Sequence, residues 1–397
     1  MSLHKEAPCV SAAGLQSQTK GSLQSQTIDW LRFPLALAVV FIHSFGLPSE
    51  VDVKAIDYGA LTGMDVYNLF RIMGSHVLTH IAVPTFFLIS GFLFFLKMEK
   101  WSKELYVSKM KKRWTSLVIP YLCWNAIAVL VVVTMKIGAF LVKGKPLSNI
   151  LLYIQEQRGW HLLWDCNVWG ENRLNWLGWP VPMSGPVDLP LWFLRDLIVV
   201  SFCTPLIYYV LKYFRHWGML LLAFAYVSGI WPSCPGFTVT TFFFFSWGAY
   251  LSMNRWNLVT SFRRYSVLSY GLSVILLLAT TALDGKATPE GMLVYPFYVI
   301  AGVVAVVNLA SSLLERGIVR CYPFLAQASF FIFASHTIMI LGKANQLTER
   351  LLPIEHPLLL TVRYLVTPCV AVAGCLLLYV LLRHYAPRLL SVLMGNR

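Results

Sequence analysis

The sequence predicts an all-α, polytopic integral membrane protein that crosses the bilayer about ten times, with both termini in the cytoplasm. Of its 397 residues, 57% are hydrophobic and only 13% are charged, against about 25% charged residues in a soluble domain. The mean hydropathy is +0.64, and long apolar runs recur along the whole chain. These observations exclude a soluble globular domain and indicate a multi-pass membrane protein.

Ten apolar segments are long enough to approach the length of a membrane-spanning helix, which is about 20 residues. They cover residues 28–47, 75–97, 114–136, 187–211, 217–232, 236–253, 265–282, 291–313, 324–343 and 358–382. The fifth and sixth are short, and WPSCPG between them is typical of a tight turn. We therefore expect a flexible cytosolic tail at 1–27, a transmembrane domain at 28–384 and a cytosolic tail at 385–397.

Lysine and arginine residues predict the orientation of these spans. With cytoplasmic termini, the inner segments are more basic than the outer ones, and KMEKWSKELYVSKMKKR at 97–113 is the most basic inner segment. The formal net charge of +14 therefore comes largely from residues that flank spans, and we predict no nucleic acid partner. The long outer segment at 137–186 contains Trp160, Trp164, Trp169, Trp176 and Trp179, which either anchor a loop at the interface or stack on a sugar ring.

The first span carries three residues with ionisable side chains, Asp29, Arg32 and His43. Arg32 and His43 are eleven residues apart, about three helical turns plus 20°, so both lie on one helix face, which Asp29 shares. Because a charge inside a bilayer is costly unless it is paired or hydrated, this face is expected to look into protein or a water-filled cavity. In the structural interpretation, Arg32 stays at the interface or pairs with Asp29, and His43 forms a hydrogen bond to a neighbouring helix. In the functional interpretation, Arg32 holds an anion and neutral His43 accepts a proton from a hydroxyl.

Five segments, taken in order, resemble the membrane-bound acyltransferase family 3. DWLRFPLALAVVFIHS is similar to the first helix of that family, in which an arginine, ten residues and a histidine follow one another, as Arg32 and His43 do. The other four segments are VPTFFLISGFLFF at 83–95, KKRWTSLVIPYLCWN at 111–125, LPLWFL at 189–194 and FFIFASHTIMI at 330–340. The last segment departs from the family, because Phe333 and Ala334 stand where a tyrosine before the histidine is usual.

The resemblance implies O-acylation, commonly acetylation, of an extracytoplasmic carbohydrate or lipid-linked glycan in the cell envelope. It implies acyl-CoA, with acetyl-CoA as the first expectation, as the cytosolic donor substrate, and no tightly bound cofactor. On this basis we expect His43 to be the general base, Arg32 to orient the donor or neutralise its phosphates, and Asp29 to hold Arg32. Direct transfer and an acyl-histidine intermediate both stay open. The expected location is the inner, or cytoplasmic, membrane, and membrane lipid is a further partner.

Four residues are predicted to bind the donor. Lys111, Lys112 and Arg113 precede the third span, where they either anchor it on anionic lipid or dock the phosphates of CoA. Ser90 and the following Gly91 interrupt a phenylalanine-rich span. Either these small residues allow two helices to approach closely, or Ser90 faces a cavity in which Gly91 leaves room for the pantetheine arm.

Three residues, Trp192, Arg195 and His336, are predicted to contact the acceptor. Arg195 is followed by Asp196, and the two form either a buried ion pair or a contact at a cavity wall. His336 is either a hydrogen-bonding residue between helices or a second base. Arg363 lies in the last span, where we expect its side chain to extend to the outer interface.

Two other patterns lead to weaker hypotheses. His76 and His80 have the i, i+4 spacing of a metal-binding pair, but no third ligand stands in a matching position, and we predict no metal site. Cys166 and Cys234 fall in predicted outer loops, where pairing stays open. Charged residues inside spans also occur in transporters and channels, which is the alternative function, although no internal repeat supports it. A non-catalytic sensor or assembly protein is a third possibility.

Overall fold

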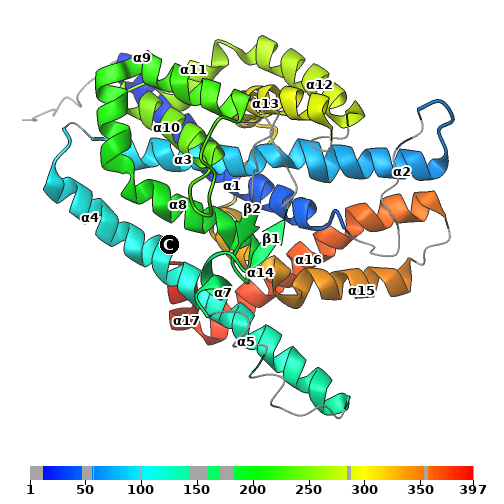
Figure 1. Cartoon of the computed structure of the whole chain (residues 1–397). Coiled ribbons are helices and arrows are strands. Elements are labelled where there is room, and N and C mark those ends of the chain that lie inside the picture. Colours follow the sequence, from blue (N-terminus) through cyan, green and yellow to red (C-terminus); the bar gives the residue numbers. More distant parts are fainter. Residues whose placement is uncertain are drawn as a thin grey trace, which may run out of the picture.

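The protein is described here by a computed structural model, which covers residues 12–46, 56, 58–98, 100–143, 152, 159–169, 183–283, 288–352 and 356–396. The side chains of residues 12–22 and of Trp169 are not part of this description. The chain is almost entirely helical, as the sequence predicts (Figure 1). Helix α1 (Ala12–His43) lies at the centre of the bundle, in contact with α3, α13, α14 and α16, whose bounds follow.

The remaining helices are α2 (Gly63–Arg71), α3 (Ala82–Phe95), α4 (Lys103–Arg113), α5 (Ile119–Val142), α7 (His161–Trp164), α8 (Trp192–Phe202), α9 (Thr204–Ser228), α10 (Val239–Met253), α11 (Leu258–Arg263), α12 (Ser266–Ala282), α13 (Pro289–Glu315), α14 (Pro323–Ser335), α15 (Leu341–Leu351), α16 (Pro357–Tyr385) and α17 (Pro387–Leu393). The π-helical turns are η1 (Ile72–Val77), η3 (Trp114–Val118) and η5 (His336–Ile340), and the 3-10 turns are η2 (Leu78–Ile81) and η4 (Leu189–Leu191). A small antiparallel sheet, which the sequence does not predict, pairs β1 (Asn167–Trp169) with β2 (Met183–Gly185), with Val168 opposite Ser184.

Six helical stretches of the described chain are long and apolar enough to cross a membrane. They are Leu23–His43, Gly63–Phe95, Lys103–Val142, Pro289–Glu315, Pro323–Leu351 and Pro357–Tyr385. Each contains or overlaps a predicted span, because an uninterrupted apolar run can satisfy its backbone in hydrocarbon only as a helix. A multi-pass membrane protein is therefore confirmed.

The region between the span Lys103–Val142 and the span Pro289–Glu315 is less regular than the sequence suggests. Helices α8 and α9 meet at a bend of 61°, and counting them as one broken span gives seven candidates among the described residues. Within α9 the backbone is non-helical at Arg215, whose φ is 48°, close to where two predicted spans were divided. Helices α10 and α12 have 15 and 17 residues, which is short for a straight crossing. The number of about ten spans and the cytoplasmic termini stay predictions.

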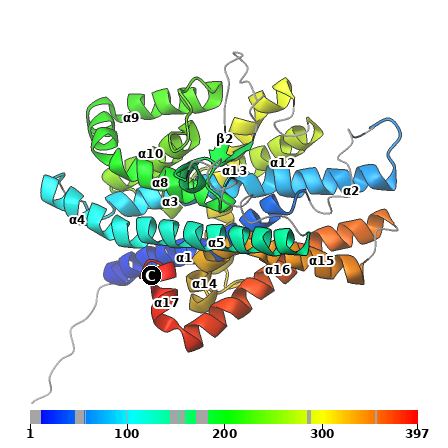
Figure 2. The same ribbon diagram turned by 60° about the horizontal axis from the view of Figure 1, so that its bottom comes forward.

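Both predicted tails contain helix in the described part of the chain. Helix α1 begins at Ala12, well before residue 28, and Thr27 is fully buried. At the other end α17 lies beside α5 (Figure 2). The indole Nε1 of Trp124 in α5 donates a hydrogen bond to the Leu393 carbonyl of α17 at 3.1 Å. Residues 1–11 lie outside the described residues, so a flexible cytosolic tail there stays a prediction.

Helices α3 and α10 cross with their backbones in direct contact. A Cβ atom placed on Gly91 would lie 2.0 Å from the carbonyl oxygen of Phe245, and one placed on Gly248 would lie 1.9 Å from that of Leu88. Only glycine fits at both positions, so the small residues of the predicted second span allow close helix approach. The crossing fixes α3 and α10, both of which contribute side chains to the cavity described next.

Candidate active site

The last residue of α1, His43, lines a cavity of about 230 Å³ in the interior of the bundle. The predicted substrate-binding residue Trp192, which begins α8, lines the same cavity. The other lining residues are Val39, Ile42, His80, Val83, Pro84, Met183, Leu189, Pro190, Tyr226, Thr240, Tyr295 and Phe333. The structure thus brings together His43 and Trp192 in a mainly apolar chamber with a few polar groups, which is the usual composition of a small-molecule site.

The imidazole ring of His336 lies beside that of His43. Their ring centroids are 5.2 Å apart and the rings are tilted by 50°. The Nδ1 of His336 is within hydrogen-bond distance of the carbonyl oxygens of Ile332, at 3.0 Å, and Phe333, at 2.9 Å. Because a carbonyl can only accept, Nδ1 carries the proton, and the Nε2 of a neutral His336 is left with a free lone pair. This Nε2 is buried and has no hydrogen-bond partner in the described part of the chain.

An interruption of the helix holds His336 in this place. His336 begins the π-helical turn η5, within which Ile338 and Met339 depart from helical geometry and Met339 has a φ of 67°. A positive φ is costly for any residue other than glycine. Turns of π-helix and broken membrane helices are found mostly where they line functional cavities. The Thr337 hydroxyl donates to the Asp188 carboxylate at 2.8 Å, which ties η5 to the segment leading into Trp192.

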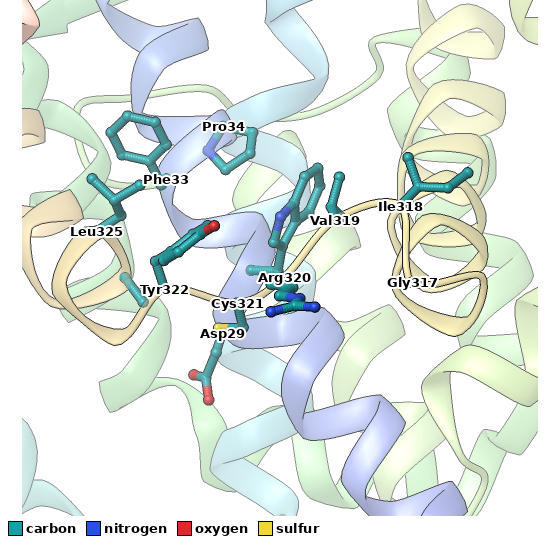
Figure 3. A pocket seen from close by; sticks show the side chains of 12 residues that line it. Asp29, Phe33, Pro34, Gly317, Ile318, Val319, Arg320, Cys321, Tyr322 and Leu325 are labelled. Carbon is teal, nitrogen blue, oxygen red and sulfur yellow. The ribbon is translucent and has the colours of Figure 1, made fainter.

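The predicted pair of Asp29 and Arg32 forms, but it is separate from the histidine cavity. The guanidinium of Arg32 lies 3.3 Å from the Asp29 carboxylate, with side chains 44% and 42% exposed. Asp29 lines a second cavity, of about 530 Å³, together with Arg320 and Tyr322 from the segment between α13 and α14 (Figure 3). This cavity shares no lining residue with the histidine cavity. Between Arg32 and His43 the α1 residues Leu35, Ala36 and Val40 are buried, so apolar residues interrupt the polar face of α1.

Of the predicted donor-binding residues, two line a common cavity and two do not. Arg113 donates a hydrogen bond to the backbone carbonyl of Ser90 at 3.4 Å, and its guanidinium lies 5.4 Å from the centre of the Phe94 ring. Arg113 and Lys111 line a cavity of about 370 Å³ between α4 and α8, whose wall is otherwise mostly apolar. Lys112 is exposed and does not line this cavity. Ser90 contributes its backbone to the Arg113 contact, and Gly91 beside it packs on α10.

Arg195 lies in a buried ion pair and does not line the histidine cavity. Its guanidinium bonds Asp196 twice at 3.0 Å and the carbonyl of Trp164 at 2.6 Å, while the other Asp196 oxygen accepts hydrogen bonds from Thr238 and Thr241. This arrangement favours the structural interpretation of Arg195 over contact with the acceptor. The predicted aromatic platform is not complete in the described chain, since residues 170–182 lie outside it.

The expectation for Arg363 is wrong. Its side chain is 1% exposed instead of extending to an interface, and its guanidinium donates to Asn345 at 3.2 Å and lies 3.6 Å from the Glu349 carboxylate. A window of apolar residues indicates that a segment enters the membrane but does not indicate which neighbour its arginine meets. The sequence analysis also missed Arg320 and Arg71. The one signal for either residue was a basic side chain close to a predicted span.

The histidines of the predicted metal-binding spacing pack against aromatic rings, and His80 also lines the histidine cavity. His76 stacks on Phe45 with ring centroids 3.6 Å apart, and His80 meets the ring of Tyr295 at 6.0 Å. Among the described residues, no three His, Cys, Asp or Glu side chains are arranged to hold a metal ion. Cys166 and Cys234, whose pairing the sequence leaves open, are both free thiols.

Comparison with known proteins gives one family and one relative. A family model described as an acyltransferase domain matches residues 25–380, which include His43, Trp192 and His336. The succinoglycan biosynthesis protein ExoH of Rhizobium meliloti (strain 1021) is 25% identical over 381 residues, which cover 94% of this chain and 92% of that protein. No solved structure matches the chain.

Proposed function

The chain belongs to the acyltransferase domain family, and from this premise we propose that it moves an acyl group from acyl-CoA to a hydroxyl of an extracytoplasmic polysaccharide or lipid-linked glycan. A glycan acceptor is supported by the name of the similar protein, which refers to succinoglycan biosynthesis. The six apolar spans support a location in the cytoplasmic membrane, where donor and acceptor are available on opposite sides.

The observation that carries this proposal is the contact between His43 and His336. Two neutral imidazoles with ring centroids 5.2 Å apart supply two nitrogen bases beside one cavity. The His336 Nε2 is an unpartnered acceptor, and His43 lines the cavity itself. General-base help of this kind typically contributes about 10²–10⁴-fold to a rate.

In the proposed reaction the acceptor oxygen attacks the thioester carbonyl carbon while its proton passes to an imidazole nitrogen. A carbon–oxygen bond forms, the carbon–sulfur bond breaks, and the thiolate of CoA takes the proton back from the imidazolium. The products are an O-acyl ester and free CoA. No net proton or electron is left over, so the step needs no further reactant.

The cavity beside Asp29 is the proposed binding site for the nucleotide part of the donor. At about 530 Å³ it falls in the range of about 300–1,000 Å³ that is usual for ligand pockets. Trp30 and Tyr322 offer aromatic surfaces for an adenine ring, and Arg320 offers a cation for phosphate. Arg32, which is paired with Asp29, adds a second cation next to this cavity.

The test uses membranes that contain the protein, labelled acetyl-CoA and cell-surface glycan. Label should pass to the glycan with the wild type, and His43→Ala should abolish transfer while the protein remains in the membrane. His384→Ala, which changes an exposed histidine of α16, is the matched control. Wild-type turnover by His43→Ala would contradict the proposed role. Flux of solute without covalent label would instead support the transporter alternative.

A further inference from the structure

Two arginines are buried together at the far end of α2 and in α16. Arg71 is 0% exposed and Arg363 is 1% exposed. The Nη2 of Arg71 donates to the amide oxygen of Asn68 at 3.2 Å, and the Nη2 of Arg363 donates to that of Asn345 at the same distance. The Arg71 guanidinium lies 5.3 Å from the centre of the Tyr67 ring, and Tyr67 packs in one cluster with Tyr364, the residue after Arg363 in α16.

The polar atoms left over in this cluster are almost all hydrogen-bond donors. The Nε and Nη1 of Arg71, the Nε and Nη1 of Arg363 and the amide nitrogen of Asn68 are buried and have no hydrogen-bond partner in the described part of the chain. The Tyr67 hydroxyl is buried as well and lies beside the Arg71 guanidinium. Since arginine has no acceptor of its own, these donors need acceptor oxygens from another source, and a ligand rich in such oxygens would supply them.

The charges of the cluster do not balance either. Glu349 lies 3.6 Å from Arg363 and is 43% exposed, whereas no carboxylate of the described residues forms an ion pair with Arg71. An unpaired guanidinium buried in a membrane protein is unfavourable, and arginines of this kind usually face a partner or a substrate path. A bound anion would supply both the missing charge and the missing acceptors.

The arginine cluster adjoins the end of α1 that carries His43. The Arg71 guanidinium lies 4.9 Å from the centre of the Phe45 ring, and Phe45 is two residues beyond His43 in the chain. The Ser75 hydroxyl donates to the Phe41 carbonyl at 2.5 Å and lies 2.8 Å from the Tyr364 hydroxyl, which joins α1 to the helices of both arginines.

We propose that Arg71 and Arg363 bind an oxyanion, a phosphate or carboxylate group, that the acceptor glycan carries. This inference rests on the proposed function, because it assigns the anion to the acceptor and names its class as an acidic or phosphate-bearing glycan. The two arginine forks hold the anionic group while a hydroxyl of the same molecule reaches the histidine cavity. Arg71 and Arg363 are therefore residues for substrate recognition and take no part in proton transfer.

The first test measures binding without any acyl transfer. Inorganic phosphate and acetate are added to the purified wild-type protein at constant ionic strength, and its unfolding temperature is measured. We expect a rise of several degrees, because a ligand that binds only the folded state stabilises it. Arg71→Gln and Arg363→Gln should each lose this rise, and Arg350→Gln, which removes an exposed charge from α15, should keep it.

The design does not depend on the variants being as stable as the wild type. Replacing a buried unpaired arginine can leave the protein equally stable or more stable, so the ligand-dependent rise is the quantity compared. If neither anion raises the unfolding temperature of the wild type, or if both variants respond as the wild type does, the proposal is overturned.

The second test identifies the source of the anion. Transfer is compared between an acidic glycan and the same glycan with its carboxylates converted to methyl esters. Arg71→Gln should raise the KM for the acidic glycan at least about tenfold and leave the KM for the ester unchanged. If the KM values do not change and stabilisation instead requires phosphatidylglycerol in nanodiscs, the site binds a lipid headgroup and the acceptor assignment is overturned. If no variant or wild type transfers label to either glycan, the proposed function fails, while the phosphate-dependent stabilisation stands.

Discussion

Replacing Gly91 by alanine is expected to force helices α3 and α10 apart. The added Cβ would lie 2.0 Å from the carbonyl oxygen of Phe245, whereas ordinary contact begins at 3.4 Å, so the backbones must separate by about 1.4 Å. The obstacle is a backbone atom, and no rotation of a side chain can relieve the overlap. Overpacking of this kind typically costs about 1–3 kcal/mol, and the rigid obstacle puts Gly91→Ala at the upper end.

The expected effect is a decrease of about 5 °C in the unfolding temperature of the detergent-solubilised protein. Gly248→Ala should have a similar effect, since its Cβ would lie 1.9 Å from the carbonyl oxygen of Leu88 on the other side of the crossing. The double variant should lose less than the sum of the two, because one separation of the helices relieves both overlaps. Transfer activity should fall as well, since Val83 of α3 and Thr240 of α10 line the histidine cavity.

Gly138→Ala and Gly271→Ala are matched controls, because both glycines lie within helices and a Cβ there meets no atom within 4 Å. These changes should leave the unfolding temperature unchanged or raise it, since alanine favours a helix by about 1 kcal/mol over glycine. An unchanged unfolding temperature in Gly91→Ala would refute the direct backbone contact between α3 and α10. It would then favour the other interpretation of the sequence, in which Gly91 leaves room for the donor.

Three further predictions concern other parts of the bundle. Arg195→Met should lower stability by about 3–5 kcal/mol, because it leaves Asp196 buried without a counter-charge, and thermal unfolding of Arg195→Met/Asp196→Asn should show partial recovery. Arg320→Glu should raise the KM for acyl-CoA more than Arg113→Glu does, in initial-rate measurements, if the cavity beside Asp29 holds the phosphates; the reverse order would favour the cavity beside Arg113. Trp124→Phe should cost at least about 1 kcal/mol of unfolding free energy and leave transfer intact, because it removes the hydrogen bond to α17 and part of a buried ring that packs on Phe331.

The sequence predicts the long spans well because hydropathy alone determines them. Each of the six candidate spans contains or overlaps a predicted segment, and the family resemblance rests on segments within or beside helices. The middle of the chain is harder, because α10 and α12 have only 15 and 17 residues and their apolar runs do not settle whether each helix crosses the membrane. Hydropathy measures compatibility with an apolar environment, and protein interior and lipid are equally apolar.

The site is only partly accessible to sequence reasoning. His43 and Trp192 were both predicted, and they line one cavity. Helical periodicity puts Asp29 on the face of His43, but it does not reveal that the two residues line different cavities. Arg363 was misplaced for a similar reason, since its partners Asn345 and Glu349 come from α15, and the sequence does not specify which helices pack together.

The helix break at η5 explains why two buried polar residues escaped any periodic pattern. His336 and Asn345 are nine residues apart, so a continuous α-helix would turn about 900° between them and put them on opposite faces. Both are nevertheless buried, His336 beside His43 and Asn345 against Arg363. The π-helical turn and the irregular backbone at Ile338 and Met339 change the register between them. One interruption therefore orients a histidine toward the candidate active site and an amide toward the arginine cluster, which joins the two sites through a single strained segment.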